Sequence, residues 1–273
     1  MKKIFFPFII LLIGLCSSCE EVVDLNLDTA APRLVVEASI YWIKESSGNA
    51  QKIKLTTTTG YYDTEIPIVT GANVKITNSE NTIFNFEEIP NSGEYACTEF
   101  VPKIGETYTL TIIYNDETYV ATEVFQSLAP ITRVEQNNEG GFTGKDIEVK
   151  AYYNDPANED NFYLYRYQYT NEATISYSID DDRFFQGNEF FSNSSNDDLK
   201  AGDVVELMHM GISQQYYNYM NILIDNTGSN SGGPFQTPPA TVRGNIKNIT
   251  NPQNYALGYF ALGETDMRRY VIQ

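Results

Sequence analysis

The sequence has little of the chemistry on which most catalytic and metal sites depend. It contains one histidine, His209, and three cysteines, Cys16, Cys19 and Cys97. A zinc site needs three or four His, Cys or carboxylate ligands, and Ser-His-Asp or Cys-His catalysis needs an imidazole beside the nucleophile. Because His209 lies between two methionines in an apolar stretch, we expect it to be a packed or hydrogen-bonded strand residue. We therefore expect a protein that is not an enzyme and has no cofactor.

Basic residues are also scarce. The chain has 18 Lys and Arg against 36 Asp and Glu, which gives a formal net charge of -18 at pH 7. Nucleic acid binding depends on basic side chains that neutralise phosphates, so we expect no nucleic acid partner. The same deficit excludes a polybasic face for binding acidic lipids.

Two acidic runs leave alternatives open. They lie at residues 154–160 and 180–182. Calcium prefers oxygen ligands, so it is the one metal that these runs could hold, although neither has the spacing of an EF-hand loop. A hydrolase with a pair of carboxylates also stays an alternative, because such pairs are recognised by their separation in space. Solvated loops explain both runs without a ligand, so we predict no metal site.

The only long apolar run lies at the N-terminus, at residues 4–15, directly after Lys2 and Lys3. A membrane-spanning helix needs roughly 20 apolar residues, so this run is too short to be one. A basic start followed by a short apolar stretch and small residues is typical of a signal peptide. We predict that residues 1–18 are such a signal and are removed.

Cys19 follows the small residues Ser17 and Ser18 at the end of that segment. This order resembles the lipobox of bacterial lipoproteins, which implies that the thiol of Cys19 is acylated and anchors the chain to a membrane. The alternative is an ordinary cleaved signal with incidental cysteines. Once Cys19 is lipidated, Cys97 is the one thiol left in the mature chain, so no intrachain disulfide can form.

Residues 19–32 are expected to be an acidic tether, with Glu20, Glu21, Asp24 and Asp28 in it. Acidic residues directly after the lipidated cysteine resemble the surface-export signal of lipoproteins in the Bacteroidota. That resemblance implies an outer-membrane protein that faces the cell exterior.

Residues 33–128 alternate apolar and polar side chains with period two, which predicts strands. Asn115 and Asp116 lie between two such stretches and predict a hairpin. Short strands without a helical stretch are typical of an Ig-like β-sandwich. The expected strands are 34–43, 52–57, 72–76, 82–86, 108–114 and 118–125.

Residues 129–273 are predicted to be a second β-rich domain with one short helix. The helix is expected at 213–224, where apolar residues recur at helical spacing; Ser213 is the N-cap and Gly228 the stop. The acidic stretch 180–200 is expected to be an irregular excursion. The expected strands are 131–135, 146–153, 161–170, 173–179 and 203–210, with two closing strands at 255–262 and 268–272.

Aromatic side chains are plentiful, with 20 Tyr in the chain. Tyr163, Tyr165, Tyr167 and Tyr169 alternate along one strand, so they share one face. Such a row is either a binding platform, because each ring offers apolar area with a polar tip, or a face that packs on a second sheet or on the helix. Phe184 and Phe185 in the acidic excursion are either a contact surface or a satellite cluster. We predict ligand binding at these six residues.

A series of short motifs runs along the whole mature chain: RLVVEA at 33–38, VTGANVKI at 69–76, GEY at 93–95, GETYTL at 105–110, PF at 234–235, PPA at 238–240, GNI at 244–246 and LGYF at 257–260. The series resembles the Bacteroidota lipoprotein family known as domain of unknown function 4249. Residues 69–108 also resemble the regulatory β-sandwich of carboxypeptidases. The family resemblance implies that the protein is encoded beside a TonB-dependent outer-membrane receptor and has it as a partner. The family supplies no catalytic residues.

These observations predict an outer-membrane lipoprotein that binds substrate for a TonB-dependent receptor or caps it. The second hypothesis is a free-standing adhesin or glycan-binding module that binds its ligand through the aromatic faces. A hydrolase with a carboxylate pair is the third. The sequence does not name the ligand.

Overall fold

The computed structural model describes residues 30–170, 175–227 and 242–273. The predicted signal peptide, Cys19, most of the tether, Gly228 and the loop after it lie outside the described residues. No helix in the described part of the chain is long and apolar enough to cross a membrane.

The first half forms seven strands, and their side chains alternate as the period-two pattern predicts. In the sixth strand Tyr108, Leu110 and Ile112 are completely buried, while the threonines between them are partly exposed. The hairpin is confirmed, because Asn115 and Asp116 both have the positive φ angles of a tight turn. The strands are β1 (Leu34–Ile43), β2 (Gln51–Thr57), β3 (Asn73–Asn78), β4 (Ile83–Glu88), β5 (Glu94–Cys97), β6 (Thr107–Tyr114) and β7 (Glu117–Val124).

The second half contains the remaining strands and the helix. The elements are β8 (Ile131–Gly140), β9 (Asp146–Asn154), β10 (Phe162–Tyr169), β11 (Ile175–Asp181), the 3-10 helix η1 (Asp182–Phe184), β12 (Glu189–Asn196), β13 (Val204–Ile212), α2 (Gln214–Thr227), β14 (Lys247–Asn248) and β15 (Leu257–Val271). The described part of the chain is thus mainly β with one α-helix, as predicted.

The prediction of an irregular excursion at 180–200 is wrong. This stretch contains η1 and then β12, which pairs with β9 along its whole length. The sequence of β12 is EFFSNSSN, which is polar enough to look like a loop. It forms a strand in which Ser192 and Ser194 bond to buried tyrosine hydroxyls and Phe190 packs on the core.

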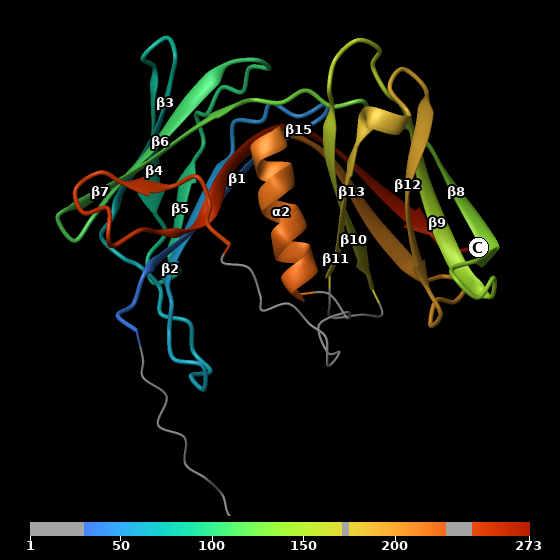
Figure 1. The fold of residues 1–273 in the computed structure, drawn as a ribbon, viewed down its shortest axis with the longest axis horizontal. Helices are drawn as coiled ribbons and strands as arrows, with labels where there is room; N and C mark the ends of the chain where they lie inside the picture. Colours follow the sequence, from blue (N-terminus) through green and yellow to red (C-terminus); the bar gives the residue numbers. More distant parts are fainter. Residues whose placement is uncertain (1–29, 171–174, 228–241) are drawn as a thin grey trace, which may run out of the picture. The chain divides into compact units, whose positions relative to one another are not determined.

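Twelve strands form one sheet in the order β11-β10-β13-β15-β1-β2-β5-β4-β3-β6-β7-β14, and β12-β9-β8 form a second sheet. The C-terminal strand β15 lies between the two halves, since it pairs parallel to β1 and antiparallel to β13 (Figure 1). Phe260 and Leu262 of β15 belong to the core of the first half. The two predicted domains therefore share a sheet, and contacts group Pro32–Gln273 as one unit.

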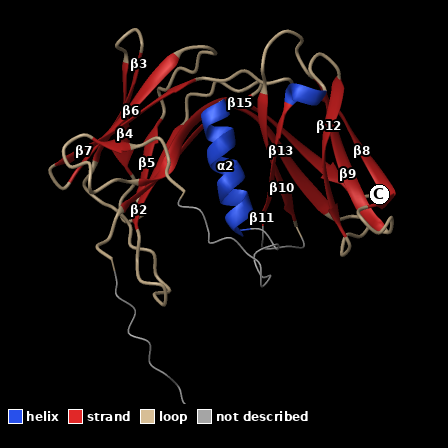
Figure 2. Cartoon of the chain, in the orientation of Figure 1, coloured by secondary structure: helices blue, strands red, loops and turns tan. Residues whose placement is uncertain are grey.

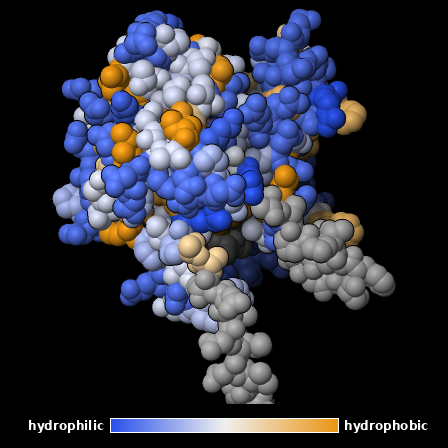
Figure 3. Space-filling model, turned by 60° about the vertical axis from the view of Figure 1, so that its left-hand side comes forward, coloured by the Kyte–Doolittle hydropathy of each residue, from blue (hydrophilic) through white to orange (hydrophobic). Residues whose placement is uncertain are grey.

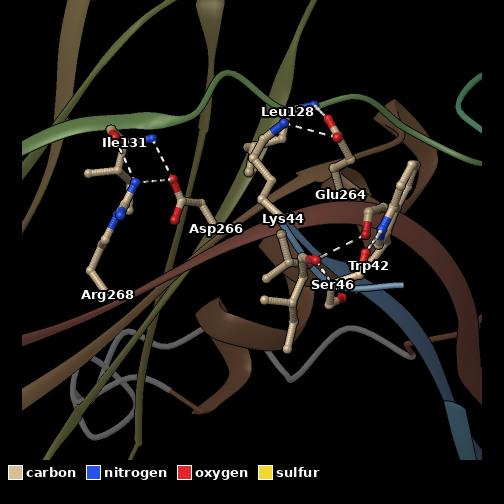
Figure 4. Close-up of polar contacts among 11 residues, drawn as sticks. Trp42, Lys44, Ser46, Leu128, Ile131, Glu264, Asp266 and Arg268 are labelled. Atoms are coloured by element: carbon tan, nitrogen blue, oxygen red, sulfur yellow. Dashed lines mark hydrogen bonds and ion pairs between the residues drawn. The ribbon is translucent and has the colours of Figure 1, made fainter. Parts of the chain in front are cut away.

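The prediction of two closing strands is also wrong, because β15 is a single strand of 15 residues. The middle of β15 contains a glycine and two acidic residues, a pattern that is typical of a turn. In the structure Glu264 and Asp266 are buried and accept hydrogen bonds from the backbone that joins the two halves (Figure 4). The Leu128 N–H donates to Glu264 at 3.0 Å and the Ile131 N–H donates to Asp266 at 2.9 Å.

Two basic side chains complete these contacts. Lys44 Nζ lies 2.9 Å from Glu264, and Arg268 Nη2 lies 3.0 Å from Asp266 (Figure 4). Arg268 also donates to the carbonyl of Ile131 at 3.1 Å. The buried carboxylates are thus paired and hydrogen-bonded, which is the condition under which a charge is tolerated inside a protein.

The helix forms as predicted and extends slightly further. The Tyr216 N–H donates to Ser213 Oγ at 3.2 Å, which confirms Ser213 as the N-cap. Tyr216 and Met220 are buried against the sheet. In Figure 2 the helix crosses in front of β15 and lies beside β10, β11 and β13.

Candidate ligand-binding groove

A cavity of about 660 Å³ lies between α2 and the strands that it crosses. Its lining comes from β1, β10, β11, β15 and one face of α2. Small-molecule sites typically occupy roughly 300–1,000 Å³ and have mostly apolar walls with a few polar groups. We call this cavity the groove.

Apolar side chains form the wall of the groove that faces the core. They are Leu164 of β10 together with Met220 and Leu223 of α2. Leu164 is 1% exposed and belongs to the cluster that holds α2 on the sheet. It lies on the face of β10 opposite the tyrosine row, so the groove uses that opposite face.

Tyrosines form the second wall. The ring of Tyr259 lies 4.6 Å from that of Tyr216 and 4.9 Å from that of Tyr219. Burial raises the pKa of Tyr216, Tyr219 and Tyr259 above the usual value. These hydroxyls therefore stay protonated and can donate hydrogen bonds inside an aromatic wall.

The position of Tyr259 is fixed from behind by a buried carboxyl. Glu123 Oε2 accepts from the hydroxyl of Tyr259 at 3.3 Å and from Ser213 Oγ at 3.0 Å. Burial raises the pKa of Glu123 above its usual value. The same carboxyl thus holds the start of α2 and one wall of the groove.

The rim of the groove is polar and open to solvent. Glu37, Ser39 and Tyr41 alternate along β1 and face the groove, and Ser176 and Tyr177 line it from β11. Tyr177 is 41% exposed. Burial raises the pKa of Tyr41. An apolar interior with a polar rim suits a ligand that has an apolar body and polar ends.

The lining contains one carboxylate, Glu37, and neither His nor Cys. Elsewhere in the described residues, no group of three or more His, Cys, Asp and Glu side chains could hold a metal ion. Nucleophilic catalysis needs a base within hydrogen-bond reach of the nucleophile. Among the hydroxyls of the groove, that of Tyr259 donates to the buried carboxyl of Glu123 at 3.3 Å, and the apolar walls with a polar rim suit a bound ligand.

The structure corrects the predicted binding role of the tyrosine row, because all four side chains are at most 3% exposed. A binding platform needs exposed ring faces, and these rings fill the space between the two sheets. Each hydroxyl bonds to a partner from β9, β12 or the loop after β9. The pairs are Tyr163 with Asp155 at 2.5 Å, Tyr165 with Tyr153 at 2.6 Å, Tyr167 with Ser192 at 2.6 Å and Tyr169 with Ser194 at 2.5 Å.

Phe184 and Phe185, which were predicted to bind a ligand together, have different environments. Phe185 is 7% exposed, and its ring stacks on that of Phe190 with centroids 3.7 Å apart, so it belongs to the core beneath the tyrosine row. Phe184 is 94% exposed and is not among the residues that line the groove. Ligand binding at Phe184 stays a prediction.

His209 is packed, as expected. It is 1% exposed, with the rings of Tyr153, Tyr163 and Tyr165 between 4.5 and 5.0 Å away. Burial lowers its pKa to about 3, so the imidazole is neutral. Neither ring nitrogen has a hydrogen-bond partner among the described residues. The histidine therefore behaves as part of the aromatic core.

The acidic runs organise loops. Asp182 Oδ2 accepts from the Asn161 N–H at 2.8 Å, and Asp155 Oδ2 accepts from the Gly187 N–H at 3.0 Å. Asp181 caps η1 and pairs with Arg183 at 2.6 Å. These carboxylates thus hold the turns around β11 and η1 in place, and they do not converge on a common point.

Exposed apolar side chains do not form a competing site on the face that Figure 3 shows. Hydrophobic residues there lie in small separate groups among hydrophilic ones. Isolated apolar residues on a surface are ordinary and need no ligand.

Comparison with protein families gives a match over residues 20–269 to the family described as Domain of unknown function (DUF4249). The chain belongs to the DUF4249 family. The match covers both halves of the DUF4249 fold, including β1, α2 and most of β15, which help to build the groove. No curated protein matches the chain.

Solved structures resemble the DUF4249 chain only distantly. A DUF4785 family protein from Legionella pneumophila has 11% identity and a TM-score of 0.27, and the match covers 67% of this chain and 54% of that one. A segment of two fibronectin type III domains from chicken tenascin has 9% identity and a TM-score of 0.22, with 66% and 90% covered. A cytokine receptor complex has 10% identity and a TM-score of 0.24, with 67% and 86% covered. The chain spans about half the length of the Legionella protein.

Proposed function

We propose that this chain is a lipid-anchored, non-enzymatic binding protein of the outer membrane that faces the cell exterior and serves a TonB-dependent receptor. It would present substrate to the receptor or cap it. The observation that carries the proposal is the groove beneath α2, which combines a volume of about 660 Å³ with apolar walls and a polar rim.

The proposed location rests on the N-terminal residues. A short apolar segment followed by small residues, Cys19 and acidic residues supports lipidation and export to the surface. Membership of the DUF4249 family supports the receptor as partner through the resemblance described above. We also propose that residues 33–128 are an Ig-like sandwich related to the regulatory domain of carboxypeptidases.

The groove favours binding over hydrolysis. Glycoside hydrolysis, the best-defined case of paired carboxylates, needs two of them facing each other at roughly 5–9.5 Å. The groove supplies Glu37 alone. A hydrolase would therefore need a second acid from outside this site.

The anchor is tested by Cys19→Ala. Three acyl chains with about 0.8 kcal/mol for each buried CH₂ group hold a protein on a membrane almost permanently, so the variant should move from the membrane fraction to the soluble fraction. Cys97→Ala is the matched control, because its thiol is buried on β5, and it should stay with the membrane. A Cys19→Ala protein that still sediments with membranes would contradict the anchor.

The partner is tested by affinity capture of the native chain from detergent-solubilised outer membranes. A receptor accessory should recover a β-barrel protein in near-equal amounts. A free-standing adhesin or glycan-binding module should recover no barrel. That second outcome would replace the proposed function with the adhesin hypothesis.

A further inference from the structure

The connection from β2 to β3 carries large side chains that do not pack on the core. It begins with residues 58–67, which we call the β2–β3 loop. In this loop Tyr61 is 87% exposed, Tyr62 71% and Ile66 67%. The rings of Tyr61 and Tyr62 lie 5.2 Å apart and nearly perpendicular. Single exposed apolar residues are ordinary, but several that gather at one place indicate a surface that meets a partner.

Hydrogen bonds give the β2–β3 loop a defined turn. Asp63 Oδ2 accepts from Thr59 Oγ1 at 2.7 Å and from the Gly60 N–H at 2.8 Å. The Asp63 N–H in turn donates to the carbonyl of Gly60 at 3.0 Å. The two tyrosines lie between these residues, so the turn itself holds them outward.

The β2–β3 loop starts beside the point where the chain enters the fold. The Thr58 N–H donates to the carbonyl of Arg33 at 2.9 Å, and the Arg33 N–H donates to Thr58 Oγ1 at 2.9 Å. Tyr61 follows three residues later, which is at most about 11 Å of chain. In Figure 1 the loop after β2 extends from the end of the first half at which β1 begins. The exposed tyrosines therefore lie near the start of the fold.

The proposed anchor brings this end of the fold to a membrane. Pro32 is 13 residues after Cys19, and an extended chain spans at most about 3.6 Å per residue. Pro32 therefore lies within roughly 45 Å of an acylated Cys19. Tyrosine is enriched at membrane–water interfaces, because its ring can enter the apolar layer while its hydroxyl stays among the headgroups. The β2–β3 loop presents this residue type at the end of the fold that the anchor holds.

We propose that the β2–β3 loop is a second contact with the membrane, in which Tyr61, Tyr62 and Ile66 enter the headgroup region of the lipids. The contact sets the orientation of the fold, which a single lipid anchor leaves free. Residues 58–67 contain Asp63 and Glu65 and no basic residue, so the contact is with zwitterionic lipid and gains nothing from anionic lipid. The inference rests on the proposed function, because it adds to the proposed anchor on the same membrane.

The first measurement uses the lipidated mature chain in vesicles of phosphatidylcholine with brominated acyl chains, which quench tryptophan fluorescence on contact. Tyr61→Trp places a tryptophan in the loop. Phe184→Trp is the matched control, because Phe184 is 94% exposed on η1. Figure 2 shows η1 at the top of the second half and the loop after β2 at the bottom of the first. Both variants keep the single native tryptophan, Trp42, and we expect most of the added fluorescence to be lost in Tyr61→Trp and none in Phe184→Trp.

The second measurement does not depend on the anchor. The mature chain with Cys19→Ala is titrated with phosphatidylcholine vesicles, and the bound fraction is found by sedimentation. Replacing Tyr61 and Tyr62 together by serine should weaken binding at least roughly tenfold, because two rings no longer leave water. The thermal midpoint should not change, because both rings are exposed in the fold. Phe184→Ser is the matched control and should bind as the parent does, and added phosphatidylglycerol should not strengthen binding in any of the three proteins.

Two results would overturn the inference and leave the anchor in place. One is equal quenching, or none, in the two tryptophan variants of a chain that sediments with the vesicles. The other is equal vesicle affinity of the parent and the double serine variant. If that variant instead loses the β-barrel protein in affinity capture, the loop contacts the receptor and not the lipid. Loop-dependent vesicle binding by a chain whose Cys19 is found unmodified would reject the proposed anchor alone.

Discussion

Replacing Asp266 by alanine should destabilise the chain strongly, because this carboxylate holds the connection between the two halves. Asp266 is 4% exposed and accepts from the Ile131 N–H at 2.9 Å and from Arg268 at 3.0 Å. Alanine leaves the buried Ile131 N–H without an acceptor, which costs about 1–3 kcal/mol, and it also removes a charge-assisted bond. We expect a total loss of about 3 kcal/mol.

The assay is urea unfolding followed by circular dichroism, together with the thermal midpoint. For a chain of this size about 1 kcal/mol moves the midpoint by roughly 2–4 °C, so Asp266→Ala should lower it by roughly 6–12 °C. Asp266→Asn is the matched control, because its amide oxygen still accepts from Ile131 and should limit the loss to about 1 kcal/mol. Equal losses of stability in the two variants, or a loss below about 0.5 kcal/mol in Asp266→Ala, would refute the reasoning.

Three further predictions concern the helix and the walls of the groove. Ser213→Ala should lower the free energy of unfolding by about 1 kcal/mol because it removes the N-cap, whereas Ser213→Asp should restore the cap; equal loss in both would contradict the capping role. Burial raises the pKa of Glu123 above its usual value of 4.5, so the stability that Glu123 contributes is fully present below pH 4.5 and is lost as the pH rises through the folded-state pKa. Glu123→Gln should remove this loss of stability. Parallel curves of stability against pH for the two proteins would contradict the prediction. Gly258→Ala should lower the free energy of unfolding by about 2 kcal/mol, because Gly258 has φ +89° and an added Cβ would meet the backbone of Val36. The control is Ala256→Gly, and an equal or larger loss of stability in that control would reject the contact with Val36.

The strand content could be read from the sequence because most strands have one buried face. Period-two alternation in β6 and β7 located both strands and their hairpin. The sequence did not predict β12 or the continuous strand β15, because their polar residues are not the exposed ones. β12 is polar because it faces tyrosine hydroxyls, and the middle of β15 is acidic because it receives backbone N–H groups from the connection between the halves.

The groove could be predicted only in part. The helical stripe of Tyr216, Met220 and Leu223 indicated a face that packs on something, and that face now forms one side of the groove. The partner face could not be chosen, because β10 carries large side chains on both faces and the tyrosine row is the more conspicuous one. Which face a sheet turns toward the helix depends on pairings with β13 and β15, which lie far along the chain.

The groove is tested most directly by mass spectrometry of the small molecules that are released when the natively purified chain is denatured. Leu223→Trp places a larger side chain in the groove, and Ile222→Trp is the matched control on the adjacent, 36% exposed position of α2, which does not line the groove. We predict that the wild type and Ile222→Trp release the same compound, with an apolar body and polar ends, and that Leu223→Trp releases none. The same compound in equal amount from all three proteins would show that the ligand lies elsewhere.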